Sequence, residues 1–591
     1  MKNRSLWLIL GTYILLAVAC SVINPIFEAP DEHHHYDAAR LIATTKQLPV
    51  ATGDTVARQE AAQPPLYYLL SALILAPIDT VSAQPRFHSN PNVDLGRFDS
   101  VNNVNAFAHT PEEAWPWSGH MLAVHAVRFL SIALGLGTLV CTHATGRLLW
   151  PSVPHRALLA TALVAFLPQF IFLHSAITND TLIIFFCSAA LWQMTRLWID
   201  KVTPWRLFIL GGTIGLAALS KTTGLLLLPL SAAELLLLAW QERDWRQLAK
   251  QMILLIVPVV LASGWMYWRN WSLYGDLFAV NVFVEHAGGD RHFTIKQAMG
   301  DLNRVWQSSI AVFGWMNLTA PTWVYMVWKG MAALGLFGLA MKGLRTLVGW
   351  LRTIRRDGFT VNLASRSRQC LLVCLLAMWP LLVFGARLQF AMRTPADQGR
   401  LLFPAILPVS LALAHSLSQL GRRWSYPVAS VLALITSVYC IFFLLPQAYA
   451  QPAIIQEADI PPEATRLNHI MGLGLELIAS EVGTLSTHPG DTVDLTLYWR
   501  SQGTAGTAPI VITKVLGREY AQIGGLPGAY HGGGIYPSTL WPPNGIIKER
   551  VRLPLVDEIT TPTEGRLVVE LAGQEGLVSV GSVSYTHLRA H

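Results

Sequence analysis

Long apolar runs separated by short polar segments fill the first three quarters of the 591-residue chain. A membrane-spanning helix needs about 20 predominantly apolar residues, and eleven runs approach that length. The first, residues 5–25, is predicted to be an uncleaved helix because no small-residue cleavage site follows it. The other runs centre on residues 121–142, 156–177, 181–198, 206–219, 223–240, 251–268, 322–341, 370–386, 401–420 and 425–446. The pattern predicts a mainly α protein whose residues 1–450 form a polytopic bundle with about eleven spans.

The basic residues support this arrangement. If the N-terminus lies inside, the loops predicted to be cytoplasmic hold 19 basic and 4 acidic residues, as the positive-inside rule requires. Because successive spans cross the membrane in opposite directions, residues 26–120, 269–320, 387–400 and everything after about 447 are then predicted to lie outside the cytoplasm. Within the first of these loops, the short apolar run 66–77 is predicted to be an interfacial or re-entrant segment.

Composition agrees with a membrane protein. Hydrophobic residues make up 52% of the chain and charged residues 13%, whereas soluble domains carry about 25% charged residues. The net charge of +7 is explained by the cytoplasmic loops, so it indicates topology and not nucleic-acid binding.

The tail changes from apolar runs to alternation. Thr492-Val-Asp-Leu-Thr-Leu-Tyr-Trp499 places Val493, Leu495, Leu497 and Trp499 on one face, as in a half-buried strand. Similar short segments separated by Gly- and Pro-rich turns predict an extracytoplasmic all-β sandwich over residues 451–583. Residues 584–591 break this pattern, and we interpret them as a non-native tail.

The richest polar cluster follows the first predicted helix, in Glu28-Ala-Pro-Asp-Glu-His-His-His-Tyr-Asp37. Pro30 suits the first position of a helix, with Asp31 and Glu32 in its first turn. Asp31 and His35 would then share a face. A carboxylate beside an imidazole can accept a proton from a hydroxyl or hold a metal. The alternative is a solvated loop that leaves a membrane helix.

Two further clusters contain candidate polar residues near the ends of predicted spans. Gln63-Pro-Pro-Leu-Tyr-Tyr68, which includes Tyr67, is also typical of an aromatic belt at the membrane surface. Asp180 is costly near the membrane unless it caps the following helix or pairs with a cation, and capping is the favoured interpretation.

Basic residues on the outer side offer sites for anions. Lys221 suits a lipid phosphate or extends to the headgroups. Arg269, beside Asn270 and before Tyr274, could bind a phosphate in bidentate geometry. Arg393 and Arg400, with Arg387, run against the positive-inside bias, and we interpret them as anion-binding residues.

These motifs, in this order, resemble those of the GT-C superfamily of membrane glycosyltransferases, which includes protein O-mannosyltransferases, aminoarabinose transferases and Rgt-like galacturonosyltransferases. They also resemble bacterial predicted membrane proteins of unknown function that share the first-loop pattern. The likeness covers roughly residues 5–446. Its motifs are Pro30-Asp31-Glu32 with His35, Gln63-Pro-Pro-Leu-Tyr-Tyr68, Asn179-Asp180, Lys221 before Gly224, Arg269-Asn270 with Tyr274-Gly275-Asp276, and Gly399-Arg400-Leu-Leu-Phe-Pro404.

The resemblance implies transfer of a sugar from a polyprenyl-phosphate donor to a glycan, lipid or protein acceptor, outside the inner membrane of a bacterial cell. It implies that Asp31 is the general base and that Glu32 orients the substrate or a metal. The substrate-binding residues would be His35, Gln63, Tyr67, Asp180, Lys221, Arg269, Asn270, Tyr274, Arg393 and Arg400.

The triple histidine 33–35 departs from the Arg/Tyr pattern common in the best-studied branches. We therefore name no metal ligand, although a divalent metal stays an option. Two other functions remain open: a lipid or glycan transporter or flippase, and a non-catalytic envelope protein for glycan assembly.

Overall fold

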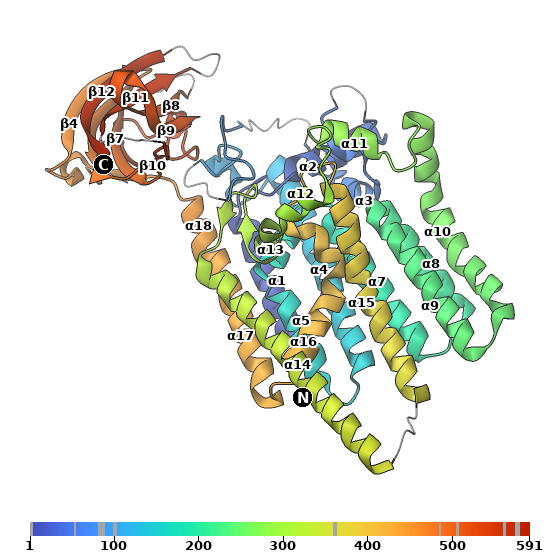
Figure 1. The fold of residues 1–591 in the computed structure, drawn as a ribbon. Helices are drawn as coiled ribbons and strands as arrows, with labels where there is room; N and C mark the ends of the chain where they lie inside the picture. Colours follow the sequence, from blue (N-terminus) through green and yellow to red (C-terminus); the bar gives the residue numbers. More distant parts are fainter. Residues whose placement is uncertain are drawn as a thin grey trace.

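The computed structural model describes residues 4–51, 55–80, 89–98, 103–357, 363–483, 486–503, 508–558, 563–573 and 579–590. Its helices form a bundle, and a separate β-domain follows at one end (Figure 1). The prediction of a mainly α polytopic protein with a C-terminal β region is confirmed.

Every apolar run of the predicted set overlaps one or more helices. Among the described residues, nine helices are long and apolar enough to cross a membrane, and a bent pair would make a tenth. The shortest predicted run corresponds to α8, which has only 17 residues. The bundle consists of α1 (Arg4–Ile23), α4 (Gly119–Leu149), α5 (Pro154–Ala165), α6 (Pro168–His174), α7 (Asp180–Ile199), α8 (Pro204–Ser220), α9 (Leu227–Glu242), α10 (Trp245–Tyr274), α14 (Thr322–Asp357), α15 (Leu363–Ala391), α16 (Ile406–Leu417), α17 (Arg422–Tyr439) and α18 (Leu445–Ala448).

One predicted span is broken. The run 156–177 is not one continuous helix, because α5 and α6 meet at a bend of 63°. Pro168 is the first residue of α6, a position where its missing N–H costs nothing. The carbonyl of Phe166, freed at the break, accepts a hydrogen bond of 2.7 Å from the Ser437 hydroxyl of α17.

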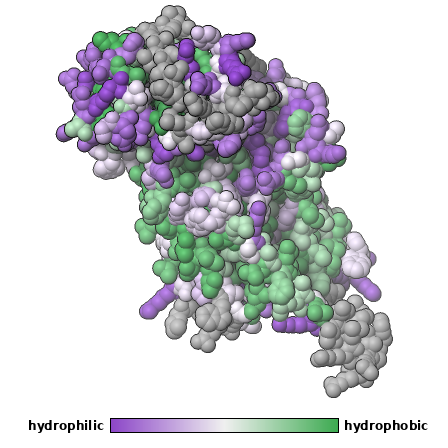
Figure 2. Space-filling view, turned by 60° about the vertical axis from the view of Figure 1, so that its left-hand side comes forward, coloured by the Kyte–Doolittle hydropathy of each residue, from purple (hydrophilic) through white to green (hydrophobic). Residues whose placement is uncertain are grey.

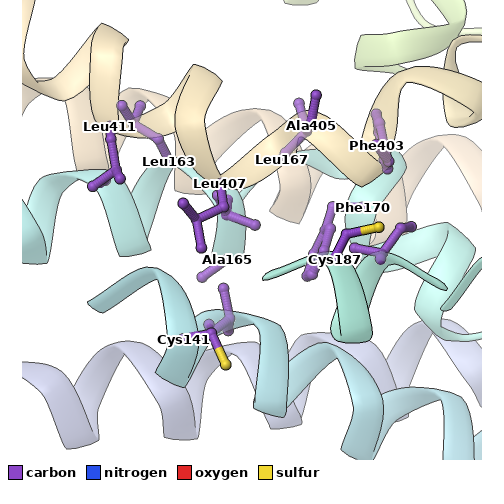
Figure 3. Packing of buried hydrophobic residues seen from close by; sticks show 14 of the residues in the cluster. Cys141, Leu163, Ala165, Leu167, Phe170, Cys187, Phe403, Ala405, Leu407 and Leu411 are labelled. Atoms are coloured by element: carbon purple, nitrogen blue, oxygen red, sulfur yellow. The ribbon is translucent and has the colours of Figure 1, made fainter. Parts of the chain in front are cut away.

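Close packing holds the bundle together. Glycines bring helices within backbone contact: a Cβ at Gly211 or Gly215 of α8 would meet the backbone of α10. Small residues of this kind allow membrane helices to pack without a hydrophobic driving force between them. Deeper in the bundle, apolar side chains of α4, α5, α6, α7 and α16 interdigitate, together with Phe403 and Ala405 (Figure 3).

The polar loops gather at one end of the bundle, opposite the N-terminus (Figure 1). Figure 2 shows apolar side chains around the bundle and hydrophilic ones over the β-domain end. The segments predicted to share one side of the membrane thus lie together. They contain α2 (Glu32–Thr45), the 3-10 helix η1 (Arg58–Ala62), α3 (Leu66–Leu75), η2 (Pro111–Glu113), α11 (Val280–His286), α12 (Ile295–Gly300), α13 (Leu302–Ile310), the hairpin β1 (Val312–Phe313) and β2 (Leu318–Thr319), and η4 (Gly399–Ala405).

The β-domain contains two five-stranded sheets, ordered β3-β10-β7-β5-β4 and β6-β12-β11-β8-β9. Leu495 and Trp499 of one sheet and Val515 and Val569 of the other belong to a single buried cluster, which makes the domain a sandwich. The strands are β3 (Ala453–Ile455), β4 (Thr465–Gly472), β5 (Leu475–Val482), β6 (Ser486–Thr487), β7 (Thr492–Ser501), β8 (Ile510–Leu516), β9 (Gln522–Ala529), β10 (Ile546–Pro554), β11 (Thr563–Ala572) and β12 (Ser579–Ala590).

The sequence suggested that the strand pattern ends before residue 584. In the structure it continues past that residue. Strand β12 continues to Ala590 and pairs along its length with β11. The backbone ladder supplies hydrogen bonds that do not depend on side-chain alternation, which explains why the segment pairs despite its irregular sequence.

Candidate active site

Asp31 lies just before α2, not inside it. The helix begins at Glu32, and Asp31 is its N-cap in the left-handed region, with φ of 63°. The prediction that Pro30 and Asp31 belong to the first turn is therefore wrong. Released from the helix, the Asp31 carboxylate accepts a hydrogen bond of 2.6 Å from the Arg400 guanidinium of η4.

A row of alternating charges extends from this pair. Arg400 Nε lies 3.6 Å from Asp180 Oδ2, and Asp180 Oδ1 accepts a bond of 2.5 Å from Lys221 Nζ. Asp180 therefore pairs with two cations. The favoured interpretation that it caps α7 is wrong: the N-cap of that helix is Asn179, with no side-chain capping bond. Four side chains from four separate segments thus form one polar group. We call this group, Asp31, Arg400, Asp180 and Lys221, the charge row.

The neighbours of Asp31 determine the protonation state of its carboxyl group. Burial raises the pKa of its carboxyl, but the Arg400 guanidinium and the His35 and His34 imidazoles lower it by more. The net pKa lies below that of a free aspartate, so the group is ionised at neutral pH and can accept a proton.

This direction predicts a pH profile. If Asp31 is the base, it keeps accepting protons until the pH falls through its lowered pKa. The rate of sugar transfer should therefore stay level from about pH 7 to about pH 5, because the acid limb lies below the ordinary value near 3.9. Asp37 offers the contrast, because burial raises its pKa to about 6. An acid limb near 6 in initial rates would point to Asp37 and contradict the assignment to Asp31.

Glu32 faces the bundle and not the charge row. Its carboxylate is fully buried and accepts two bonds from Arg128 of α4, at 2.8 Å and 2.7 Å. It also accepts the backbone N–H of Ile177 at 2.9 Å. Since Arg128 further binds three carbonyl groups between Ser21 and Pro25, the pair joins the end of α1 to α4 and to the turn before α7.

His35 belongs to a second buried group. Its Nδ1 lies 3.0 Å from Tyr68 Oη and 3.2 Å from Glu60 Oε2, and Tyr68 donates to that Glu60 oxygen at 2.5 Å. Asn179 donates to Gln63 Oε1 at 2.6 Å. These contacts fix α2, η1, α3 and the start of α7 relative to one another.

Tyr67 contacts α4 and the turn before α7. Its hydroxyl accepts the N–H of Thr178 at 3.1 Å and lies 2.9 Å from Ser131 Oγ. The side chain is fully buried. Tyr67 therefore supports the turn that carries Asn179 and Asp180, and it is not part of an exposed aromatic belt.

A small cleft opens beside Arg400, with room for about one water molecule. One wall is formed by α6 and the turn after it, and the other by η4 and α13. At this wall Gln398 Oε1 is buried without a hydrogen-bond partner, whereas Arg400 Nε faces Asp180 at 3.6 Å. Because buried polar groups are normally satisfied, the Gln398 amide offers one polar contact to a small group in this cleft. Its lining consists of Ala29, Pro30, Gln169, Phe172, Leu173, Ala176, Thr178, Ser308, Met316, Gln398, Gly399 and Arg400.

Four predicted binding residues form contacts outside the charge row. Arg269 donates to the Pro49 carbonyl at 2.7 Å, and Tyr274 Oη accepts the N–H of Ala51 at 2.9 Å. Both join α10 to the segment after α2. Asn270 donates to the Leu277 carbonyl at 3.3 Å, and Arg393 pairs with Asp290 at 2.9 Å. The basic residues on the outer side were expected to converge. Lys221 and Arg400 meet at Asp180, whereas Arg269 and Arg393 lie elsewhere.

The described residues do not fit a metal centre. No group of three His, Cys, Asp or Glu side chains in that part of the chain is placed to hold a metal ion. Asp31 and Asp180 both face Arg400, and the His35 Nδ1 is occupied by Glu60 and Tyr68.

Sequence reasoning missed Glu60, Arg128 and Gln398. Arg128 lies inside a span, where an ionisable residue usually marks a functional or paired position, so this rule could have identified it. Glu60 and Gln398 sit in polar loops, and no pattern in the sequence distinguishes them from solvated residues.

Residues 120–268, about a quarter of the chain, match the model of the dolichyl-phosphate-mannose-protein mannosyltransferase family. The likeness to that family is therefore shown for this segment alone. The matched segment contains Arg128, Asp180 and Lys221, and thus half of the charge row. A comparison with curated protein sequences gives no significant match.

Two solved structures are remotely similar to this chain. ArnT from Cupriavidus metallidurans bound to undecaprenyl phosphate is 12% identical, with a TM-score of 0.44 over 78% of this chain and 68% of that one. The Archaeoglobus fulgidus oligosaccharyltransferase AglB, in complex with an inhibitory peptide and a dolichol-phosphate, is 13% identical. Its TM-score is 0.38, over 76% of this chain and 56% of that one.

Proposed function

We propose that this protein is a GT-C glycosyltransferase, which transfers a sugar from a polyprenyl-phosphate donor to an acceptor hydroxyl with Asp31 as the general base. The observation that carries the proposal is the charge row Asp31–Arg400–Asp180–Lys221 at the edge of a cleft. An ionised carboxylate next to two fixed cations combines a proton acceptor with groups that stabilise a departing phosphate.

The two cations have donors to spare. An ammonium has three N–H donors and a guanidinium five, and Lys221 donates one hydrogen bond, to Asp180. Arg400 Nε faces Asp180, and the two terminal nitrogens of Arg400, with four N–H groups between them, each donate one hydrogen bond, to the Pro30 carbonyl and to Asp31. A lipid phosphate can therefore bind to Lys221 and Arg400 while their carboxylate partners stay in place.

The chemical step follows from this placement. The acceptor oxygen attacks the anomeric carbon of the sugar, and the bond from that carbon to the phosphate oxygen breaks. The acceptor proton moves to an Asp31 carboxylate oxygen. The electron pair of the broken bond stays with polyprenyl phosphate, whose growing charge Lys221 and Arg400 stabilise. Attack opposite to the leaving group inverts the anomeric carbon.

Glu32 acts in this proposal as a positioning residue. Its buried pair with Arg128 holds the backbone next to Asp31. His35, Gln63 and Tyr67 hold the surrounding turns, and the Asn179 amide orients the start of α7. Arg269, Asn270, Tyr274 and Arg393 keep the surrounding loops together and reach the substrate only at the edge of the site.

The proposed location is the inner membrane of a bacterial cell. The basic residues of the loops at the N-terminal end of the bundle favour the cytoplasm for that end. The charge row, the cleft and the β-domain then lie outside the cytoplasm, where the acceptor is a glycan, a lipid or a protein.

A vesicle assay tests the proposal. Purified protein in liposomes with a labelled polyprenyl-phosphate hexose should release labelled glycoside to an added acceptor. Lys221→Gln should raise the KM for the donor roughly 10-fold or more, because a bond to a charged group contributes about 1.5–3 kcal/mol.

The matched control is Lys296→Gln, which removes an exposed lysine at the same end of the bundle and should leave KM unchanged. Accumulation of labelled lipid in the opposite leaflet, without any glycoside product, would instead support a flippase. An unchanged donor KM in Lys221→Gln would contradict the phosphate site.

A further inference from the structure

The β-domain is fastened to the first loop by a joint of asparagines and glycines. Asn90, Asn103 and Asn105 of the loop are all buried and surround Gly534 in the turn after β9. The Asn105 amide donates to the Gly534 carbonyl at 2.7 Å. A Cβ at Gly534 would collide with Asn90 and Asn103 and would come within 2.8 Å of Asn105 Oδ1.

The glycines of this joint cannot be replaced without strain. Gly532, Gly533 and Gly534 have φ values of 69°, 69° and 94°, a region that other residues rarely adopt. A second tie lies nearby, where Asn92 donates to the Gly528 carbonyl at 2.7 Å. The contact is therefore a fitted interface and not a loose linker.

The same loop is hydrogen-bonded to the segment that carries Asp31. Glu28, which is fully buried, accepts the backbone N–H groups of Ala106 at 2.7 Å and Phe107 at 3.0 Å with one carboxylate oxygen. These are the residues that follow Asn105. Glu28 stands three residues before Asp31.

His109 strengthens this tie. Its two ring nitrogens lie 3.1 Å from Glu28 Oε1 and 2.8 Å from Glu113 Oε1. Burial lowers the pKa of His109, but its bonds to Glu113 and Glu28 raise it to about 9. At neutral pH the imidazolium therefore bridges two carboxylates with charge-assisted bonds.

The Asp31 segment needs such support. Phe27 and Asp31 have φ values of 65° and 63°, and each left-handed residue other than glycine costs about 1–3 kcal/mol unless its surroundings hold it. Two such residues lie within five positions. The segment keeps this shape because other parts of the molecule fix it.

We propose that the β-domain positions Asp31, through Gly534, Asn105 and Glu28. The proposal rests on the role of Asp31 in the proposed function. It assigns the β-domain a part in sugar transfer: the contact of the β-domain with the first loop sets the distance of the Asp31 carboxylate from the acceptor. Asn105 and Glu28 are positioning residues, because they act through the backbone that carries Asp31.

The test compares Gly534→Ala, Asn105→Ala and the control Gly573→Ala in the full-length protein. Gly573 also lies in the β-domain, and an added Cβ there meets nothing within 4 Å. Two measurements are made on each: transfer kinetics, and hydrogen–deuterium exchange of the peptides covering residues 26–32 and 103–109.

Both joint variants should lower kcat about 10- to 100-fold, the size of loss that a misplaced reacting group produces. The donor KM should change less than about 2-fold, because Lys221 and Arg400 are not part of the joint. Exchange should become faster in both peptides. Gly573→Ala should match the wild type in every measurement.

Faster exchange in 103–109 with no change in 26–32 would overturn the proposal, as would an unchanged kcat in both joint variants. Asn105→Ala changes only the loop side of the joint, so it decides the matter if Gly534→Ala disrupts the β-domain. Failure of the wild type to transfer any sugar would overturn the proposed function. The exchange data would still decide whether the β-domain holds the Asp31 segment.

Discussion

Replacing Asp31 by asparagine is expected to lower the rate of sugar transfer by about 100- to 10,000-fold, the range that a positioned general base contributes. The amide keeps the size of the side chain and can still accept a hydrogen bond from Arg400. It cannot take up the proton of the acceptor hydroxyl. The loss should therefore appear in kcat, with a donor KM close to that of the wild type.

Asp37→Asn is the matched control, because it makes the same change six residues further along the chain, inside α2. It should retain most of the activity. Expression and thermal denaturation of both variants in detergent should resemble the wild type. Turnover by Asp31→Asn within a few fold of the wild type would contradict the assignment of the base.

The largest loss of stability is expected for Arg128→Met. The side chains of Arg128 and Glu32 have no exposed surface, and removal of one partner of such a buried pair typically costs about 3–5 kcal/mol. Methionine fills the volume but leaves the Glu32 carboxylate without its counter-charge. Arg128→Met should therefore lower the midpoint of thermal denaturation in detergent.

The double variant Glu32→Gln with Arg128→Met separates charge from packing. It removes the unpaired carboxylate, so it should recover part of the lost stability. Arg97→Met serves as the control, because Arg97 is mostly exposed in its pair with Asp94 and such pairs contribute about 0–1 kcal/mol. Equal stability of Arg128→Met and wild type would show that the pair does not hold α1 to α4.

The helical bundle could be predicted because membrane spans are encoded locally. Twenty apolar residues in succession fix a helix whatever surrounds it. The bend between α5 and α6 was missed because an apolar run does not show whether its helix is unbroken. Pro168 is nevertheless a recognisable sign of a helix start. The sandwich was similarly readable from alternation in β7.

The site could be predicted only in part. The residues of the charge row stood out because carboxylates and cations are costly at a membrane surface. Which of them meet depends on contacts such as that of Asp31 with Arg400, 369 positions apart. No periodicity encodes such a contact. For the same reason, Arg269 and Arg393 looked like anion sites, whereas their partners are a carbonyl and an aspartate of neighbouring loops.

The left-handed backbone at Asp31 was also beyond sequence reasoning. Pro30, Asp31 and Glu32 form a normal start of a helix, and the local preference favours Asp31 inside it. In the structure the Asp31 carboxylate instead binds Arg400, and the buried Glu32–Arg128 pair holds the residue next to it.

The most direct test of the central claim is a structure of the protein with bound polyprenyl phosphate. The proposed function predicts density for the phosphate within hydrogen-bonding distance of Lys221 or Arg400, with the Asp31 carboxylate still next to Arg400. A phosphate bound elsewhere on the bundle, with the charge row unchanged and out of reach of the lipid, would contradict it.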